Sequence, residues 1–185
     1  SAARRRRADA PGRGSTGACA GGFRHQFTTE VNIRLSQAST PMIVGFTEEH
    51  GIEVDVQQDG YLFVERRPDA WSRAREVAAF QRSLGVPVEL LDPTAAGELV
   101  PGLALDDVVG ATFCANDGIA DPGALTQGYA TLAARAGVVA RYGVEVTGLD
   151  TEGGRVAGVR TTAGPIATDA VVCATGAWTS TLTAT

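Results

Sequence analysis

A glycine-rich stretch, Gly14 to Gln26, holds the residue types in this sequence that are best suited to binding a ligand. It contains four glycines and two hydroxyl side chains, Ser15 and Thr16, with almost no side-chain bulk before Phe23. Glycine has no Cβ, so its backbone N–H groups can approach a ligand closely. A helix is expected soon afterwards, as in loops that hold phosphate groups. A flexible linker has a similar composition, so these residues alone leave both interpretations open.

The acidic and metal-binding residue types give weaker signals. Asp117 and Asp121 could be a carboxylate pair for acid–base work, but local roles are favoured: a turn for Asp117 and a helix cap for Asp121. The three cysteines, at positions 19, 114 and 173, lack metal-ligand spacing, so no metal site is expected. Neither histidine, His25 or His50, has the motif context of a nucleophilic triad. No catalytic residue is assigned.

Composition and charge exclude several classes of protein. The chain has 185 residues, 44% of them hydrophobic, as in a soluble globular domain. Its net charge of −5 argues against nucleic-acid binding, and the run Arg4–Arg7 is interpreted as a solvated tail. No apolar run approaches membrane-spanning length. The odd cysteine count, with no signal-peptide pattern, predicts a cytoplasmic protein.

Hydrophobic periodicity predicts four helices, over residues 31–50, 68–84, 93–100 and 122–136. Pro41 should kink or split the first of them. Its expected buried stripe consists of Leu35, Ala38, Met42 and Phe46. The second helix is expected to bury Val77, Phe80 and Leu84. Asp92 and Asp121, each followed by proline, mark the starts of the last two.

Strands are expected over residues 54–65 with a break at Asp59-Gly60, and over 86–91 and 108–114. Three more, over 138–149, 155–162 and 166–175, form a predicted β-meander with turns at Gly153-Gly154 and Ala163-Gly164. Residues 170–174 are continuously apolar, which predicts a strand buried on both faces. That strand ends in a small-residue turn, where an open α/β sheet binds ligand.

Four stretches resemble, in the same order along the chain, the D-amino-acid-oxidase-like family of FAD-dependent oxidoreductases. They are Gly14–Arg24, Gln58–Leu62, Asp117–Pro122 and Val172–Trp178. Within that family the chain is most similar to the glycine oxidase and sarcosine oxidase β-subunit group. The resemblance covers nearly the whole chain from Gly14 on. It implies an enzyme that oxidises an amine or amino acid, glycine-like or sarcosine-like, by hydride transfer to flavin N5.

The resemblance implies FAD contacts at eight positions, which are Ser15, Thr16, Ala20, Gly21, Gly22, Val146, Ala174 and Gly176. The two hydroxyl residues would meet the diphosphate, and the next three would pass close to the flavin ring. The valine would meet adenine through its backbone, and the last two would flank the ADP end. Some relatives attach flavin through a histidine that falls here at Ala18, while His25 lies in a different frame. FAD is therefore expected to bind non-covalently.

The family's Gly-x-Gly-x-x-Gly turn is absent from the sequence. The chain also starts at Ser1 and stops soon after Trp178, so it is expected to be a fragment that lacks the N-terminal Rossmann motif and the C-terminal part. The residues that grip the substrate carboxylate in relatives lie mostly beyond Thr185. Two alternatives therefore stay open: a truncated product without autonomous activity, and a small nucleotide-binding module.

The expected fold class is α/β, or mixed α+β. It combines a partial Rossmann-like FAD-binding domain, with its β-meander, and part of an antiparallel-sheet substrate domain. We expect a solvated Arg-rich tail over residues 1–13 and the FAD-binding loop and helix over 14–50. The substrate-side segment should follow over 51–121, and the remaining FAD-binding segment over 122–185. The expected partner is a small-molecule amine or amino acid, with no nucleic acid and no membrane; the oligomeric state is left open.

Overall fold

The computed structural model describes residues 10–176, 179 and 180, and the chain divides into two compact units. The larger unit comprises residues 15–132, and the other comprises 1–14 and 133–185. Every sheet among the described residues is antiparallel. This mixture of helices and antiparallel strands confirms the predicted α+β class.

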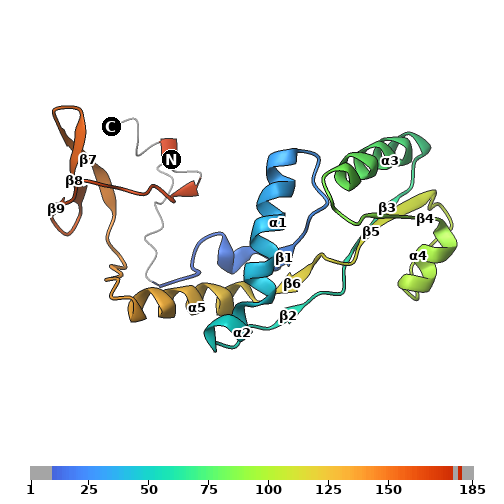
Figure 1. Cartoon of the computed structure of the whole chain (residues 1–185), viewed down its shortest axis with the longest axis horizontal. Coiled ribbons are helices and arrows are strands. Elements are labelled where there is room, and N and C mark those ends of the chain that lie inside the picture. The colour runs from blue at the N-terminus through green and yellow to red at the C-terminus, as the bar shows by residue number, and fades with distance from the viewer. Residues whose placement is uncertain (1–9, 177–178, 181–185) are drawn as a thin grey trace, which may run out of the picture. The chain divides into compact units, whose positions relative to one another are not determined.

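Two three-stranded sheets form the frame of the larger unit (Figure 1). The first has the order β1 (Gly22–Phe23), β6 (Gly118–Ala120), β2 (Val56–Gln57). The second has the order β3 (Tyr61–Glu65), β5 (Gly110–Cys114), β4 (Glu89–Leu91). The predicted break at Asp59-Gly60 is confirmed: Gly60, with φ of 86°, takes the chain from one sheet to the other. Each sheet joins segments that are distant in sequence.

The helices begin and end close to the predicted residues. They are α1 (Glu30–Val44), α2 (Phe46–His50), α3 (Pro68–Ser83), α4 (Pro93–Leu99) and α5 (Pro122–Arg135). A short 3₁₀ turn, Thr16–Ala18, was not predicted. The first predicted helix is split at Gly45, four residues after Pro41. Asp92 caps α4 by accepting a hydrogen bond from the Ala95 N–H at 2.8 Å. Asp121 caps α5 by accepting from the N–H groups of Gly123 and Ala124.

The core lies between α1, α3 and the second sheet. Its buried members are Ile33, Ala78, Val86, Val88 and Cys114, with Phe27, Leu84 and Leu90 packed against them. The predicted stripe of α1 is wrong for Leu35 and Met42, whose exposed fractions are 62% and 54%, and for Ala38, which is also exposed. In α3 the buried residues are Ala78 and Gln81, whereas Phe80 is exposed. The spacing of apolar residues identified the helices, but the elements packed against each helix determine which of its faces is buried.

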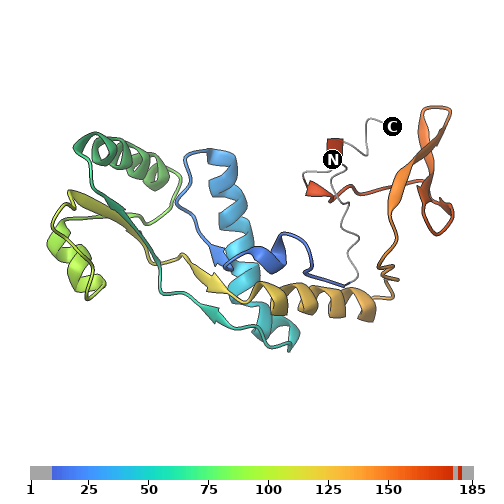
Figure 2. The same ribbon diagram turned by 180° about the vertical axis from the view of Figure 1, so that it is seen from behind.

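The smaller unit contains one antiparallel sheet, with β8 (Arg155–Thr161) between β7 (Val146–Glu152) and β9 (Ile166–Ala167) (Figures 1 and 2). The predicted turn at Gly153-Gly154 is confirmed, and both glycines have positive φ. Residues 138–145, predicted as strand, are not in the sheet. The buried strand predicted over 170–174 is also wrong, because the residues there are exposed and unpaired, with Val172 94% exposed. A strand is buried on both faces only where other elements cover it. None of the described residues covers residues 170–174.

Candidate functional site

The glycine-rich stretch enters the larger unit as an edge strand beside β6. Gly22 pairs with Ile119, and Phe23 pairs with Gly118. The carbonyl of Gly21 accepts a hydrogen bond from the Ala120 N–H at 3.0 Å. Gly21 has φ of 80°, and a Cβ there would collide with the carbonyl oxygen of Ala120. Residues 21–23 of the stretch are therefore bonded to the sheet, which excludes the flexible-linker interpretation for this part.

The predicted loop residues have different surroundings. Ser15 and Ala20 are exposed and Thr16 is half-buried; Ser15 and Thr16 accept backbone hydrogen bonds that close the 3₁₀ turn. Gly22 is exposed, yet a Cβ there would collide with the Tyr61 hydroxyl. The need for glycine at position 21 thus arises from the backbone of Ala120, whereas a Cβ at position 22 would require the Tyr61 side chain to shift. The sequence revealed neither contact.

The eight predicted cofactor residues are divided between the two units. Val146, Ala174 and Gly176 belong to the unit that contains residues 133–185, and all three are exposed. Val146 pairs with Thr161 at the start of β7, and Gly176 has φ of 55°. Their role at the ADP end of the cofactor stays a prediction.

An open hollow of about 430 Å³ lies beside β1 and α1. Its lining combines aromatic rings, three hydroxyl side chains from α1 and one cation; the residues are Gly22, Phe23, Arg24, Phe27, Ser36, Ser39, Thr40 and Tyr61. Such a mixture of apolar surface and a few polar groups is typical of small-molecule sites. Of the residues predicted to contact the cofactor, Gly22 lies in this lining.

Arg24 is the cation of this hollow. Its guanidinium carbon lies 4.8 Å from the centre of the Phe27 ring and 5.3 Å from that of Phe63, so both contacts are cation–π contacts. Among the described residues it forms no ion pair with an acidic side chain. A partly buried guanidinium without a carboxylate partner is suited to binding an anion.

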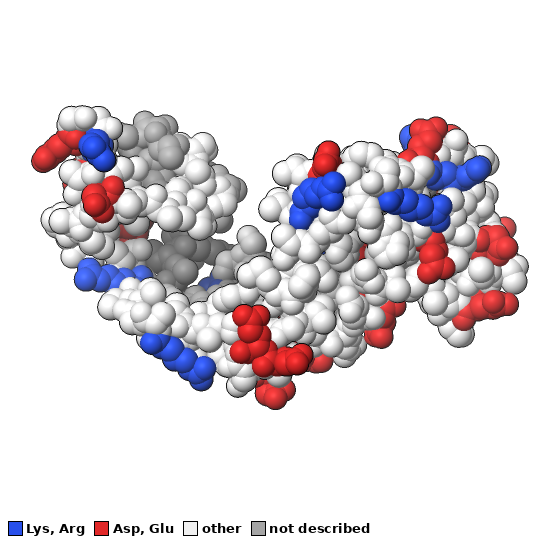
Figure 3. Space-filling model, in the orientation of Figure 1, with Lys and Arg blue, Asp and Glu red and all other residues white. Residues whose placement is uncertain are grey.

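A second hollow, of about 650 Å³, has the opposite charge. It lies beside α2 and β2 and is lined in part by Glu53, Asp55 and Asp121. Figure 3 shows acidic side chains gathered over the same elements. Because these carboxylates repel anions, the hollow that contains Arg24 is the better candidate for a carboxylate or phosphate ligand.

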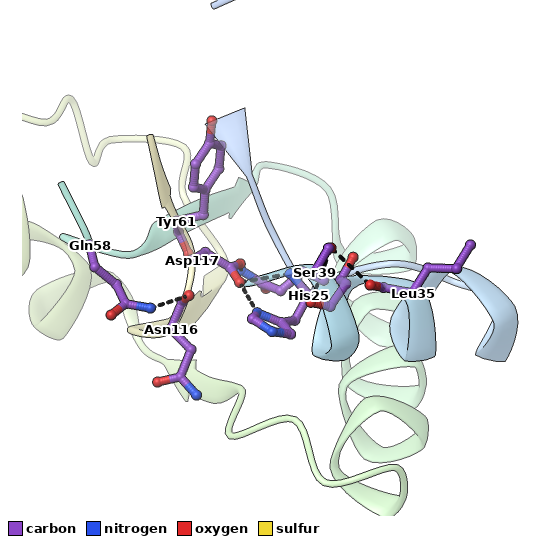
Figure 4. Close-up of polar contacts among 9 residues, drawn as sticks. His25, Leu35, Ser39, Gln58, Tyr61, Asn116 and Asp117 are labelled. Atoms are coloured by element: carbon purple, nitrogen blue, oxygen red, sulfur yellow. Dashed lines mark hydrogen bonds and ion pairs between the residues drawn. The ribbon is translucent and has the colours of Figure 1, made fainter. Parts of the chain in front are cut away.

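The two residues after Arg24, His25 and Gln26, belong to a buried polar network with Asp117, and Figure 4 shows the contact between His25 and Asp117. Oδ1 of Asp117 accepts hydrogen bonds from the backbone N–H of His25 at 2.7 Å and from its Nδ1 at 2.8 Å. A carboxylate only accepts, so Nδ1 of His25 carries a proton. Oδ2 of Asp117 accepts from Nε2 of Gln26 at 3.3 Å. Asp117 is thus more than a turn residue, and no local sequence signal points to partners more than 90 residues away.

His25, Cys114 and Asp117 also bring three potential metal-ligand atoms within 4.8 Å of one another. Burial, assisted by the nearby Asp117 charge, raises the pKa of the Cys114 thiol to about 12. The hydrogen bond between His25 and Asp117 joins Nδ1 to Oδ1, and Oδ2 accepts from Gln26. This arrangement favours a structural network over a metal centre.

No helix within the described ranges is long and apolar enough to cross a membrane.

Comparison with known proteins supplies the family. The chain is 36% identical to a D-amino acid dehydrogenase of Phenylobacterium zucineum over 148 residues, which are 79% of this chain and 35% of that protein. It is 38% identical over 157 residues to a D-amino acid dehydrogenase of Cereibacter sphaeroides, covering 82% of this chain and 35% of that one. The chain therefore spans about a third of the length of these curated relatives.

Solved structures share the fold. An L-proline dehydrogenase from P. horikoshii superimposes with a TM-score of 0.85 at 34% identity, over 93% of this chain and 46% of that one. A glycine oxidase from Geobacillus kaustophilus does so with a TM-score of 0.83 at 28% identity, over 94% and 48%. The family model for FAD dependent oxidoreductases (DAO) matches residues 6–185. The chain therefore belongs to the DAO family of FAD-dependent oxidoreductases.

Proposed function

We propose that this chain is the part of an FAD-dependent oxidoreductase that binds both flavin and an amino-acid substrate. The relatives support an amino acid as substrate, because they are named for D-amino acids, L-proline and glycine. The observation that carries the proposal is Arg24, the cation of the hollow beside β1. The α-carboxylate is the group that these three kinds of substrate share, and a guanidinium can bind it through two parallel hydrogen bonds.

The residues around Arg24 fit the cofactor as well as the substrate. Gly22 presents exposed backbone at the hollow beside the Tyr61 hydroxyl, and having no side chain of its own it would let a flat ring approach the strand. Ser15 and Thr16, with the exposed turn that contains them, would contact the diphosphate through hydroxyl and N–H groups. FAD, when bound non-covalently, would accept a hydride from the substrate carbon that bears the amine. Arg24 would hold the substrate by its carboxylate so that this carbon faces the ring.

The proposal is tested on the protein expressed from its complete reading frame, mixed with FAD and desalted. We expect a retained flavin absorption band that bleaches anaerobically with at least one of glycine, sarcosine, L-proline and D-alanine. The Arg24→Gln variant should need about 100-fold more substrate for the same bleaching rate, because it loses a charge-assisted hydrogen-bond pair. Arg34→Gln is the matched control, since Arg34 is exposed and pairs with Glu30.

Three outcomes separate the alternatives. A colourless protein would contradict flavin binding and favour a product without autonomous activity. A retained band that no amino acid bleaches would favour a nucleotide-binding module. Bleaching that Arg24→Gln leaves unchanged would exclude Arg24 as the carboxylate ligand.

A further inference from the structure

We propose that Asp117 is a positioning residue that fixes the direction of Arg24 and thereby the affinity of the site for carboxylates. The inference rests on the proposed function, because it takes Arg24 to be the anion ligand. It goes further in assigning a role to a buried carboxylate that lies in neither of the two hollows.

Arg24 is anchored on both sides by one short segment of chain. On its N-terminal side, Gly22 and Phe23 pair with Ile119 and Gly118 of β6. On its C-terminal side, the backbone N–H and the ring of His25 both donate to Asp117, the residue directly before β6. The backbone before and after Arg24 is therefore held by residues 117–119, and Asp117 provides the second anchor.

The network extends from Asp117 to another residue of the hollow. Nε2 of Gln26 donates to Oδ2 of Asp117 and also to the carbonyl of Tyr61, at 2.9 Å, while its Oε1 accepts from Thr112 at 2.8 Å. Tyr61 lines the same hollow as Arg24. Asp117 thus links the segment that bears Arg24 to Tyr61, whose backbone is also held by its pairing with Cys114 of β5.

Burial makes the network intolerant of change. The exposed fractions of Asp117, His25 and Gln26 are 0%, 6% and 8%. Among the described residues no buried side-chain polar atom lacks a hydrogen-bond partner. An amide in place of the carboxylate keeps one acceptor oxygen, so its N–H₂ must face the donors of either His25 or Gln26. The buried donors that then face each other must move apart. The displaced segment is the one that bears Arg24.

Among the described residues, the Arg24 side chain has cation–π contacts with two rings and no ion pair. A shift of this segment therefore moves the guanidinium, which affects function more than a loss of packing would. With no acidic partner to redirect it, the guanidinium follows its backbone. A displacement of about 1 Å is enough to disrupt a two-point hydrogen-bonded contact with a carboxylate.

The test compares two probes of nearly equal shape, propionate and the uncharged propionamide, by calorimetric titration of the flavin-loaded protein. We expect Asp117→Asn to weaken propionate binding about tenfold, as for the loss of one well-aligned hydrogen bond to a charge, and to leave propionamide within about twofold. His25→Leu keeps the backbone N–H donor of residue 25, so it should weaken propionate binding by only about threefold, less than Asp117→Asn does. This second variant decides the matter if Asp117→Asn does not fold.

Asp121→Ala is the matched control, because Asp121 caps α5 and lines the second hollow, away from the one that contains Arg24. It should lower the melting temperature while both affinities stay unchanged. Unchanged propionate binding in the Asp117 and His25 variants, or equal weakening of both probes, would overturn the positioning role. Failure of the proposed function gives a different result: the unmodified protein would then show no preference for propionate over propionamide.

Discussion

Asp117 and Asp121 have the same side chain and lie four residues apart, yet their surroundings differ completely. Asp121 is exposed and satisfies two N–H groups at the start of α5. Asp117 is fully buried and accepts three hydrogen bonds from His25 and Gln26. The cap was predictable because its donor and acceptor groups lie within three residues of one another in the sequence. The network was not, because its donors lie at the other end of the larger unit's sequence.

Cys114 gives a pH-dependent prediction at the same scale. Its pKa rises from 9.0 to about 12 in the folded protein, through burial first and the Asp117 charge second. The folded state therefore holds the proton more tightly than the unfolded state does. The stabilisation is complete below pH 9 and is lost as pH rises from 9 toward 12, by at most about 1.4 kcal/mol per pH unit.

Urea unfolding of the wild type and of Cys114→Ala between pH 8 and pH 11 measures this effect. The difference in unfolding free energy between the two proteins should shrink or reverse above pH 9, since other titrating groups cancel in the comparison. A difference independent of pH would show that the thiol ionises equally in both states.

At the scale of elements, α1 shows how packing overrides periodicity. Leu35, Ala38 and Met42 have helical spacing, but the buried face carries Ile33 and Thr40 instead. Gln37 on that side donates to the carbonyl of Leu84 at 2.8 Å. A helix with apolar residues on two faces contains two candidate stripes, and only contact with α3 and the sheet selects one.

Two substitutions in α1 test this assignment. Ile33→Ala should lower the unfolding free energy by about 2–4 kcal/mol, because Ile33 is fully buried in the core cluster. Leu35→Ala, two residues away, should change it by about 0.5 kcal/mol or less. Chemical denaturation gives both values, and a larger loss for Leu35→Ala would place the core on the opposite face.

For the whole molecule, the division into two units has a measurable consequence. Residues 136–145 lie outside helices and sheets, and residues 136–143 are exposed. Arg141, in this segment, should be the preferred site of limited trypsin cleavage, because exposed backbone without pairing adapts readily to a protease. The arginines of α1 and α3 should resist, because a helix must unfold locally to be cut.

Mass spectrometry of a timed digest identifies the first cut. The expected early product ends at Arg141 and contains all of residues 15–132. An initial cut at Arg34, Arg73 or Arg75 would contradict a separately compact larger unit.

The sequence by itself determined the features that depend on neighbours along the chain. It located the helices to within a few residues, the split near Pro41, the caps at Asp92 and Asp121 and the Gly153-Gly154 turn, because each depends on local geometry and hydrogen bonds. Its ordered motifs also indicated the FAD-dependent family. Only the tertiary structure decided which helix faces are buried and that residues 170–174 lie exposed. It also decided that the carbonyl of Ala120 requires glycine at position 21, that Gly22 lies against the Tyr61 hydroxyl, and that Asp117 anchors the residue after Arg24. These features depend on contacts between residues far apart in sequence, which local patterns do not encode.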